Sequence, residues 1–321
     1  MKNKQSYFLI HFACLMLLIV LPWGSDTFFS SYFLDVATRV LIIWIALLGF
    51  DLLAGYAGLV SLGYAMFFGL GAYGAAMSLQ AGLSILPLVL LIGMASAGLP
   101  SLLVGYFSTR SRGIYFILAT LVFAEAAFQL VLNGGSVTGG RNGIFSIPKT
   151  PFNLAWWQVD WAEPFSAYYL ALLVFAMAYL TARKIVGSPF GSALAAIKSN
   201  EDRTAFLGYD VAAVKRRIFV VSSLFAGLAG ALWAHHQSYV SPELLHWTFS
   251  GQMLIMTWLG GAGTLVGPLI GGAVLTLMAD VLSSVMKNWL IIFGLLYILV
   301  VMFSPKGLWG LLLKLNNRRR P

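Results

Sequence analysis

Few residues of this sequence are of the types that perform catalysis, and their spacing matches no catalytic arrangement. The 321 residues include 11 acidic residues, four histidines and a single cysteine, Cys14. A lone cysteine excludes a disulfide within the chain. His235 and His236 have no further ligands at a spacing that metal sites use. Because no Ser–His–Asp or Cys–His pattern with a local signature is present either, we predict no catalytic residue and no metal site.

Glu125 is the ionisable residue with the most unusual surroundings, because it interrupts an apolar stretch that extends from 113 to 140. An ionisable group at membrane depth costs ~2.5–3.5 kcal/mol on insertion scales for comparable charges, and it usually faces a bundle interior or water. We therefore expect Glu125 to line a polar path or to brace helices near Ser61 or Tyr115. A protonated, hydrogen-bonded structural carboxyl is the alternative.

The composition indicates what kind of scaffold must position such a group. Hydrophobic residues make up 60% of the chain and charged residues only 10%, with a mean hydropathy of +0.85. A soluble domain is roughly half apolar and a quarter charged, so a soluble or disordered protein is excluded. The net charge of +9 does not indicate nucleic-acid binding, because most basic residues lie at the ends of apolar runs.

Long runs without charge predict an all-α, polytopic membrane protein. A membrane helix needs ~20 mainly apolar residues, and lipid offers no partners for backbone amides, so such runs must be helical or form a closed barrel. Residues 42–48 do not alternate as barrel strands would. We predict about eight to ten transmembrane helices, with candidate spans at 6–23, 36–54, 59–80, 84–107, 114–132, 165–182, 213–235, 247–262, 266–285 and 288–304.

The distribution of Lys and Arg predicts the orientation of the chain. With ten spans and a cytoplasmic N-terminus, 16 of the basic residues fall on one side and 4 on the other, which is a strong positive-inside bias. Both termini are then cytoplasmic. We expect one transmembrane permease domain over 1–321, with an external loop at 133–164 and a cytoplasmic loop at 183–212.

The 183–212 loop has its own helix signals. Ser188 can cap a helix that begins at Pro189, and Asn200 can cap a second helix that ends near Gly208. Asp210 can cap the next membrane helix. A structured loop of this length is usually functional, and short apolar-faced helices suit docking in a partner's groove. A loop that packs on the protein's own helix ends is the alternative.

Five stretches, in one order over about residues 35–310, resemble the branched-chain amino-acid permease family of ABC importers. The 188–208 stretch resembles the family's cytoplasmic coupling loop. The other four are Gly55-Tyr56-Ala57-Gly58-Leu59-Val60-Ser61-Leu62-Gly63 with Phe67–Tyr73, Arg112–Phe116 with Phe123-Ala124-Glu125, Thr138–Pro148, and Gly260–Leu265 with Gly267-Pro268.

The resemblance implies a permease subunit that imports Leu, Ile or Val across the bacterial inner membrane. Its partners would be a second homologous permease, two cytoplasmic ATPase subunits and an external substrate-binding protein, within the lipid bilayer and without nucleic acid. No Gly-x-x-x-x-Gly-Lys-Ser/Thr motif is present, so this chain would bind no cofactor and the partner subunits would use the ATP. The expected coupling residues are Ser188, Pro189, Gly191, Ala195, Ile197, Asn200, Glu201, Ala205, Leu207 and Gly208.

Glycine-rich segments supply the remaining candidate residues. Glycine permits close helix approach, and in unwound stretches it exposes backbone groups that could bind a zwitterionic amino acid. The candidates for the translocation path are Gly55, Tyr56, Gly58, Ser61, Gly63, Gly69, Gly71, Tyr73 and Glu125, with pure close packing as the alternative for the glycines. Gly263, Gly267 and Gly271 form a small-residue face that predicts helix packing, within the chain or against a second permease.

Other functions remain open from the sequence alone. Urea, short amides or aromatic acids are alternative cargoes. An ion-coupled secondary transporter would need several intramembrane acidic or basic residues, and a membrane enzyme would need several polar residues converging at one depth, which the charge-free runs argue against.

Overall fold

The computed structural model describes residues 31–83, 85–149, 152–154, 157–159, 163–285, 294 and 307–310. The spans predicted at 6–23 and, except for position 294, at 288–304 lie outside these residues. All eight other predicted spans are present as helices. They are α3 (Ser31–Phe50) with its π-helical continuation η2 (Asp51–Tyr56), α4 (Tyr64–Gln80), α5 (Leu86–Ser108), α6 (Ile114–Leu132), α8 (Pro164–Val186), α11 (Val211–Gln237), α12 (Trp247–Gly260) and α13 (Val266–Val285).

The helices confirm the prediction of a polytopic helical membrane protein. Within the described residues, five helical segments of 19–27 residues have a mean hydropathy of 1.7–2.1 and are long enough to cross a bilayer. α4 and α12 are shorter, with 17 and 14 residues. The combined segment of α3 and η2 is longer than the predicted span 36–54, because it begins at Ser31 and continues to Tyr56.

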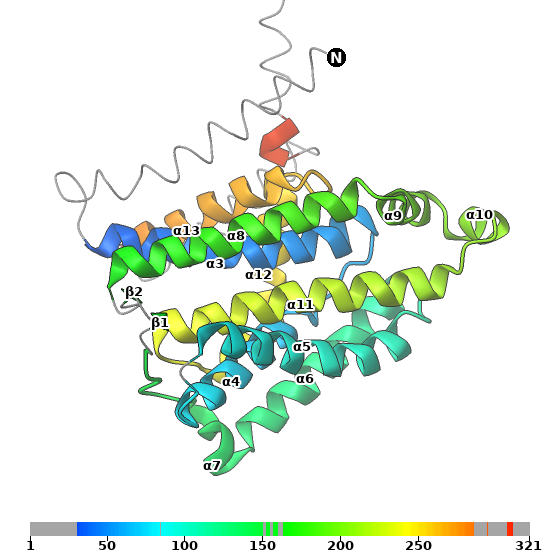
Figure 1. The fold of residues 1–321 in the computed structure, drawn as a ribbon. Coiled ribbons are helices and arrows are strands. Elements are labelled where there is room, and N and C mark those ends of the chain that lie inside the picture. Colours follow the sequence, from blue (N-terminus) through cyan, green and yellow to red (C-terminus); the bar gives the residue numbers. More distant parts are fainter. Residues whose placement is uncertain are drawn as a thin grey trace, which may run out of the picture.

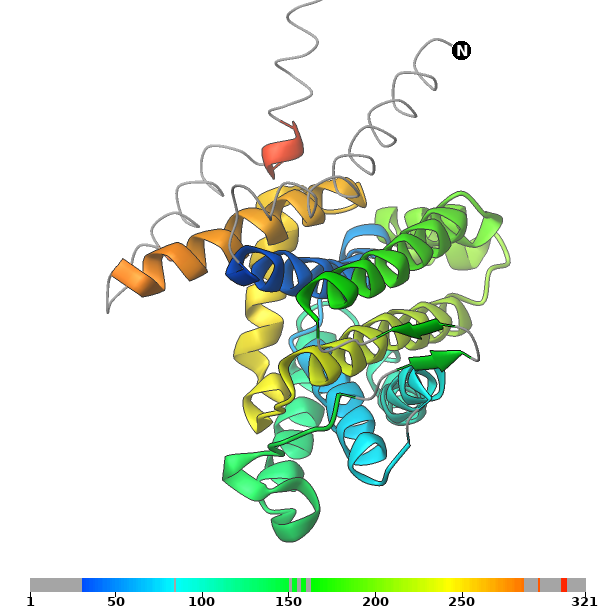
Figure 2. The same ribbon diagram turned by 60° about the vertical axis from the view of Figure 1, so that its left-hand side comes forward.

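The helix α11 lies at the centre of the bundle and packs against α3, α4 and α5, while α8 and α13 cover α3 (Figures 1 and 2). Glycine permits the closest of these approaches. A Cβ on Gly227 of α11 would lie 2.5 Å from the Cβ of Ala97 on α5, and a Cβ on Gly71 of α4 would meet the Gly227 backbone. The buried hydroxyl of Tyr64 lies 3.0 Å from the carbonyl of Ala46 and 2.9 Å from that of Ser222, which joins α4 to α3 and α11.

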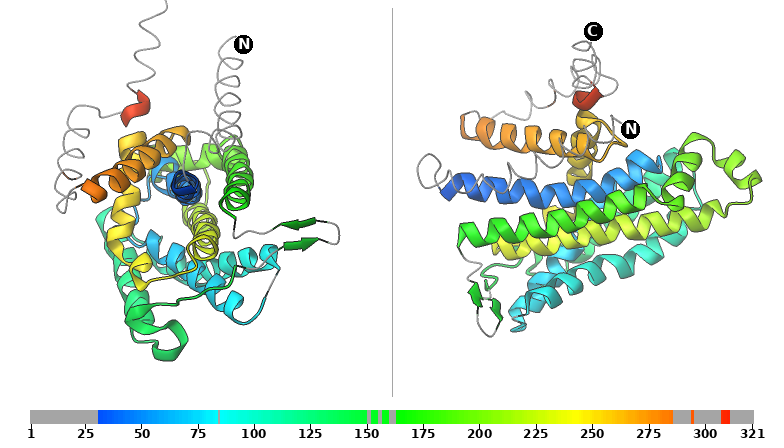
Figure 3. Two further views of the ribbon diagram at one scale, coloured as in Figure 1. Left: turned by 90° about the vertical axis from the view of Figure 1, so that its left-hand side faces the viewer. Right: turned by 45° about the horizontal axis from the view of Figure 1, so that its top comes forward.

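The bundle has two dissimilar ends, seen at opposite sides of Figure 1 and again in Figure 3. At one end, which we call the α9–α10 end, α8 is followed by the short helices α9 (Pro189–Ser199) and α10 (Glu201–Phe206) before α11 begins. At the other, the hairpin end, lie the small elements of the 133–164 loop and the 3₁₀ turn η4 (Pro242–Leu245). The loop elements are α7 (Gly135–Thr138), η3 (Gly140–Asn142) and the antiparallel strands β1 (Phe152–Leu154) and β2 (Trp157–Val159).

Candidate coupling and translocation sites

The two short helices of the 183–212 loop begin at the predicted capping residues. The Gly191 amide donates to the Ser188 hydroxyl (3.4 Å), and the Arg203 amide donates to the Asn200 side chain (2.9 Å). The Ala213 amide donates to Asp210 at the start of α11 (2.9 Å). Gly208 has φ +88, a conformation that favours glycine after a helix. The cap predictions are confirmed, and they fix the path of the loop.

The expected coupling residues fall into three groups. Gly191 and Ile197 are buried, and a Cβ on Gly191 would lie 2.7 Å from the Ile185 carbonyl, so these residues hold α9 against α8. Six of the expected coupling residues are exposed, namely Pro189, Ala195, Asn200, Ala205, Leu207 and Gly208, while Ser188 and Glu201 are partly buried.

The most exposed apolar side chain of this loop is not among the predicted coupling residues. Phe206, at the end of α10, is 92% exposed, and its neighbour Leu207 is 71% exposed. Two adjacent large apolar side chains at the tip of a structured loop are typical of a surface that binds another protein. The signal for Phe206 was present in the sequence, since it adjoins two residues that were selected, but helical spacing alone did not show which side chain faces outward.

Glu201 makes contacts within the chain. Its carboxylate forms an ion pair with Lys215 of α11 and a second with Arg112 in the α5–α6 connection (3.1 Å), while Arg112 also contacts Asp202 (2.8 Å). Lys215 is buried, with a side chain only 3% exposed. The hydrogen bond to Asp202, together with the charges of Asp202 and Glu201, raises the pKa of the Arg112 guanidinium. These ion pairs attach α10 both to α11 and to the start of α6.

A second attachment joins α9 to the glycine-rich segment. Lys198, in the last turn of α9, donates from Nζ to the backbone carbonyl of Gly55 in η2 (2.5 Å). In the same turn of η2, the fully buried Asp51 accepts the amides of Gly263 (2.6 Å) and Leu265 (3.0 Å) from the α12–α13 turn. Three stretches that resemble family signatures therefore meet at one place, at the α9–α10 end.

Most of the glycine-rich path candidates lie in tightly packed surroundings. The Gly63 amide donates to the buried Ser61 hydroxyl (3.2 Å), and a Cβ on Gly63 would lie 2.7 Å from the Thr120 backbone of α6. A Cβ on Gly69 would collide with Leu245 of η4. Like Gly71, Gly63 and Gly69 lie where two segments pack closely together. This agrees with the alternative that the glycines serve close packing. Two other candidates of the set, Tyr56 and Tyr73, are half-buried and buried respectively.

Glu125 is partly buried and lies on α6, the least covered of the five membrane-length helices among the described residues. Only 22% of the apolar window of α6 is buried, and Val122 and Leu130 are 63% and 75% exposed. The Gln129 amide donates to the Glu125 carboxylate (2.9 Å). This hydrogen bond comes from one turn along α6, and the expected bracing by Ser61 or Tyr115 is not the contact that the structure gives Glu125.

The small-residue face of α13 packs within the chain. A Cβ on Gly271 would lie 2.8 Å from the Gly260 amide, and one on Gly267 would lie 2.6 Å from the Thr264 hydroxyl and 2.8 Å from the Gly260 carbonyl. Gly263 belongs to the turn before α13 and has φ +80. Gly267 and Gly271 therefore bring α12 and α13 together.

Charged residues within the bundle toward the hairpin end are paired with one another. Arg39 of α3 contacts Asp35 and Asp280 (both 3.2 Å), and His236 Nε2 lies 3.0 Å from Asp35. These contacts connect α3, α11 and α13. No group of three or more His, Cys, Asp or Glu side chains that could hold a metal occurs in the part of the chain that the structure describes.

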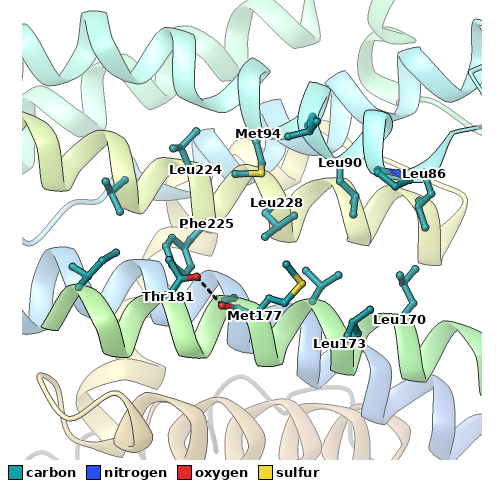
Figure 4. A pocket seen from close by; sticks show the side chains of 16 residues that line it. Leu86, Leu90, Met94, Leu170, Leu173, Met177, Thr181, Leu224, Phe225 and Leu228 are labelled. Carbon is teal, nitrogen blue, oxygen red and sulfur yellow. Dashed lines mark hydrogen bonds between the residues drawn. The ribbon is translucent and has the colours of Figure 1, made fainter. Parts of the chain in front are cut away.

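A cavity of about 970 Å³ lies between α5, α8 and α11 (Figure 4). Its lining is apolar and includes Leu90, Met94, Leu173, Met177 and Leu228, which point into the space from the three helices. The hydroxyl of Thr181, the polar side chain of the lining, donates to its own helix at the Met177 carbonyl (2.8 Å). A zwitterionic cargo would lose its hydration here without replacement, so this cavity lacks the chemistry of a cargo site.

The chain is similar to known transport permeases over most of its length. Residues 32–303 match the family described as the permease component of branched-chain amino acid transport systems. The LivM permease of the high-affinity branched-chain amino acid transport system is 30% identical in both Salmonella typhimurium and Escherichia coli, over 95% and 98% of this chain and 75% and 78% of theirs. A probable LivM permease of Methanocaldococcus jannaschii is 24% identical over 63% of this chain and 61% of its own. No solved structure matches. The chain belongs to the family of permease components of branched-chain amino acid transport systems.

Proposed function

We propose that this chain is the membrane subunit through which an ATP-driven importer moves Leu, Ile or Val into the cytoplasm. The observation that carries the proposal is the rigidly attached α9–α10 loop with its exposed apolar tip, in a family member that has no phosphate-binding loop. A chain that cannot bind ATP in the usual way needs a surface on which separate ATPase subunits can act, and this loop has the exposure and the anchoring for it.

The docking surface would comprise the exposed apolar tip of the loop and the exposed alanines of the two short helices. It combines Phe206 and Leu207 at the tip with the small residues Ala195 and Ala205, which permit close approach. The buried residues of the loop serve a different purpose, because Gly191, Ile197 and the capping residues give the surface its shape. A pair of ATPase subunits would bind one such loop on each of two permeases.

The orientation follows from charge. The basic residues of the 183–217 segment lie at the α9–α10 end, and the positive-inside bias places that end and both termini in the cytoplasm. The hairpin end then faces outward across the bacterial inner membrane. The outer loop around Ile144, which pairs with Val240, would receive the external substrate-binding protein.

The translocation path would run along the uncovered face of α6. A carboxylate facing lipid is costly, and Glu125 lies on a helix that its own chain leaves mostly exposed. A second homologous permease covering this face would remove Glu125 and Gln129 from lipid and place them beside a path between the two subunits. A carboxyl group at this position is a hydrogen-bonding partner for the ammonium group of an amino acid.

Other cargoes and other energy sources are outcomes of the experiment. The complex of both permeases with the ATPases is reconstituted in liposomes, and uptake of labelled leucine, urea, a short amide and an aromatic acid is measured. We expect leucine uptake that requires ATP and is unaffected by a protonophore. Uptake that persists without ATPase but collapses with the protonophore would show an ion-coupled transporter.

Substitution at the loop tip tests the docking surface separately. Phe206→Asp, at an exposed site, should leave membrane insertion intact and abolish co-purification with the ATPase, and Gly208→Trp should do the same. Val137→Asp changes a 68% exposed apolar residue at the hairpin end and should have no effect on co-purification. Unchanged co-purification of the Phe206→Asp variant would refute the assignment of this surface.

A further inference from the structure

Lys198 bonds α9 to the membrane bundle at η2. Its Nζ donates to the Gly55 carbonyl at 2.5 Å, near the end of η2, where helix carbonyls lack partners in the helix. Gly58 has φ +73, and a Cβ there would lie 3.1 Å from Lys198 Cγ. The glycine thus makes room for the lysine stem, and the contact is built by both segments.

Asp51 extends this contact to a third segment. Both of its carboxylate oxygens accept backbone amides from the α12–α13 turn, at 2.6 Å from Gly263 and 3.0 Å from Leu265. Leu265 has φ +59, an unusual backbone conformation for a residue with a bulky side chain. The hydrogen bond from its amide to Asp51 stabilises this conformation. A Cβ on Gly263 would lie 3.7 Å from Lys198 Nζ, so the ammonium lies beside the turn as well as beside η2.

The charges of this cluster are complementary. Asp51 is fully buried, and among the described residues Lys198 is a cation near enough to act on its carboxylate. An ammonium at this point offsets a buried negative charge and a free helix carbonyl together. Lys198 therefore connects α9 with η2 directly and with the α12–α13 turn through the surroundings of Asp51.

We propose that Lys198 is a positioning residue that makes α9, η2 and the α12–α13 turn move as one body when the loop is displaced. The proposal rests on the proposed function of the 183–212 loop and adds the route by which its movement reaches the membrane helices. Lys198 is exposed, but its Nζ is bonded to the Gly55 carbonyl of η2, so we assign it to the attachment of α9 and not to the docking surface. Without its bond, a docked ATPase would move α9 while η2 and the turn stayed behind.

The first experiment measures transport and ATP hydrolysis in the reconstituted complex of both permeases and the ATPases. Lys198→Gln should keep co-purification and ATP hydrolysis within about twofold of the parent, while leucine uptake per ATP falls about tenfold. Lys198→Arg, which restores a cationic donor, should recover most of that ratio. Lys184→Gln is the matched control, because it removes an exposed lysine at the end of α8 without touching η2.

A second measurement follows the movement itself. Spin labels replace Ser192 on α9 and Trp258 near the end of α12, both exposed, in a chain whose Cys14 is changed to Ser. The distance between the labels should stay the same in the nucleotide-free and ATP-trapped states of the complex. With Lys198→Gln the same distance should change between those states.

The outcomes separate this inference from the proposed function. Two results would overturn the inference but leave the proposed function intact. One is an equal ratio of uptake to ATP hydrolysis in Lys198→Gln and Lys184→Gln, and the other is a label distance that Lys198→Gln does not affect. Loss of co-purification in Lys198→Gln also overturns it, because the lysine would then belong to the docking surface. Failure of the unsubstituted chain to co-purify with any ATPase overturns the proposed function and the inference with it.

Discussion

The ion pair between Glu201 and Lys215 should respond very differently to the loss of its two members. Lys215 is 3% exposed and its carboxylate partner is Glu201, whereas Glu201 is 23% exposed and also contacts Arg112. Glu201→Gln therefore leaves a buried ammonium without a counter-charge. Lys215→Met leaves a carboxylate that still has Arg112 and some water, and it replaces the lysine with an apolar side chain of similar length.

The size of the difference follows from these exposures. Removing one member of a buried pair costs about 3–5 kcal/mol. Because the glutamine carbonyl introduced by the first substitution can still accept a hydrogen bond and the site is partly open, we expect about 2–3 kcal/mol for Glu201→Gln. For Lys215→Met we expect about 1 kcal/mol or less. At 1.4 kcal/mol per tenfold, the opening of α10 should increase about 30- to 140-fold in the first variant and about fivefold at most in the second.

Hydrogen exchange measures this opening directly. The amides of Thr204, Leu207 and Gly208 are bonded within α10 and its C-terminal turn, so their exchange rates report how often the helix leaves the bundle. The double variant Glu201→Gln/Lys215→Met should exchange more slowly than Glu201→Gln alone, because no unpaired ammonium remains. Glu243→Gln, an exposed acid at the hairpin end, is the control. Equal or faster exchange in Lys215→Met than in Glu201→Gln would refute the reasoning.

Two further predictions concern the bundle and the path. Gly271→Leu should lower the stability of the detergent-purified protein by about 1–3 kcal/mol, because the new side chain would meet the Gly260 amide. Thermal unfolding measures this loss. The control Gly251→Ala, where nothing lies within 4 Å of the added Cβ, should cause no loss. Equal midpoints for both variants would contradict the packing of α12 on α13. Glu125→Gln should preserve the complex with the ATPase but lower leucine uptake about tenfold, since a charge-assisted hydrogen bond is worth about 1.5–3 kcal/mol; an unchanged initial rate of uptake would remove Glu125 from the path.

The local features of the fold could be predicted from the sequence. A helix that crosses the bilayer needs about 20 apolar residues, so charge-free runs indicate where such helices lie. The bounds predicted at 114–132 and 266–285 agree with α6 and α13. The caps at Ser188, Asn200 and Asp210 depend on neighbouring residues, and the structure confirms all three. Charge-free runs and capping residues are both local signals, because each lies within one helix or next to its end.

The contacts between distant segments could not be predicted in this way. Asp51 and Gly263 are 212 positions apart, and no periodicity relates them. The sequence placed Lys215 in a run of basic residues that the positive-inside bias explains, whereas the structure buries it against Glu201. Glu201 was selected as a coupling residue from the resemblance of the 188–208 stretch, and only the direction of its side chain shows that it contacts α11 and the α5–α6 connection.

The most direct test of the account is a crosslink from the tip of the loop. A photoreactive amino acid is placed at Phe206, and for comparison at Val137, in inner-membrane vesicles that contain the whole transporter. We predict that the probe at 206 attaches to the ATPase chain and the probe at 137 does not. Attachment of the probe at 206 to lipid alone, or to a protein on the outer face, would contradict the claim that ATPase subunits move this permease through α9 and α10.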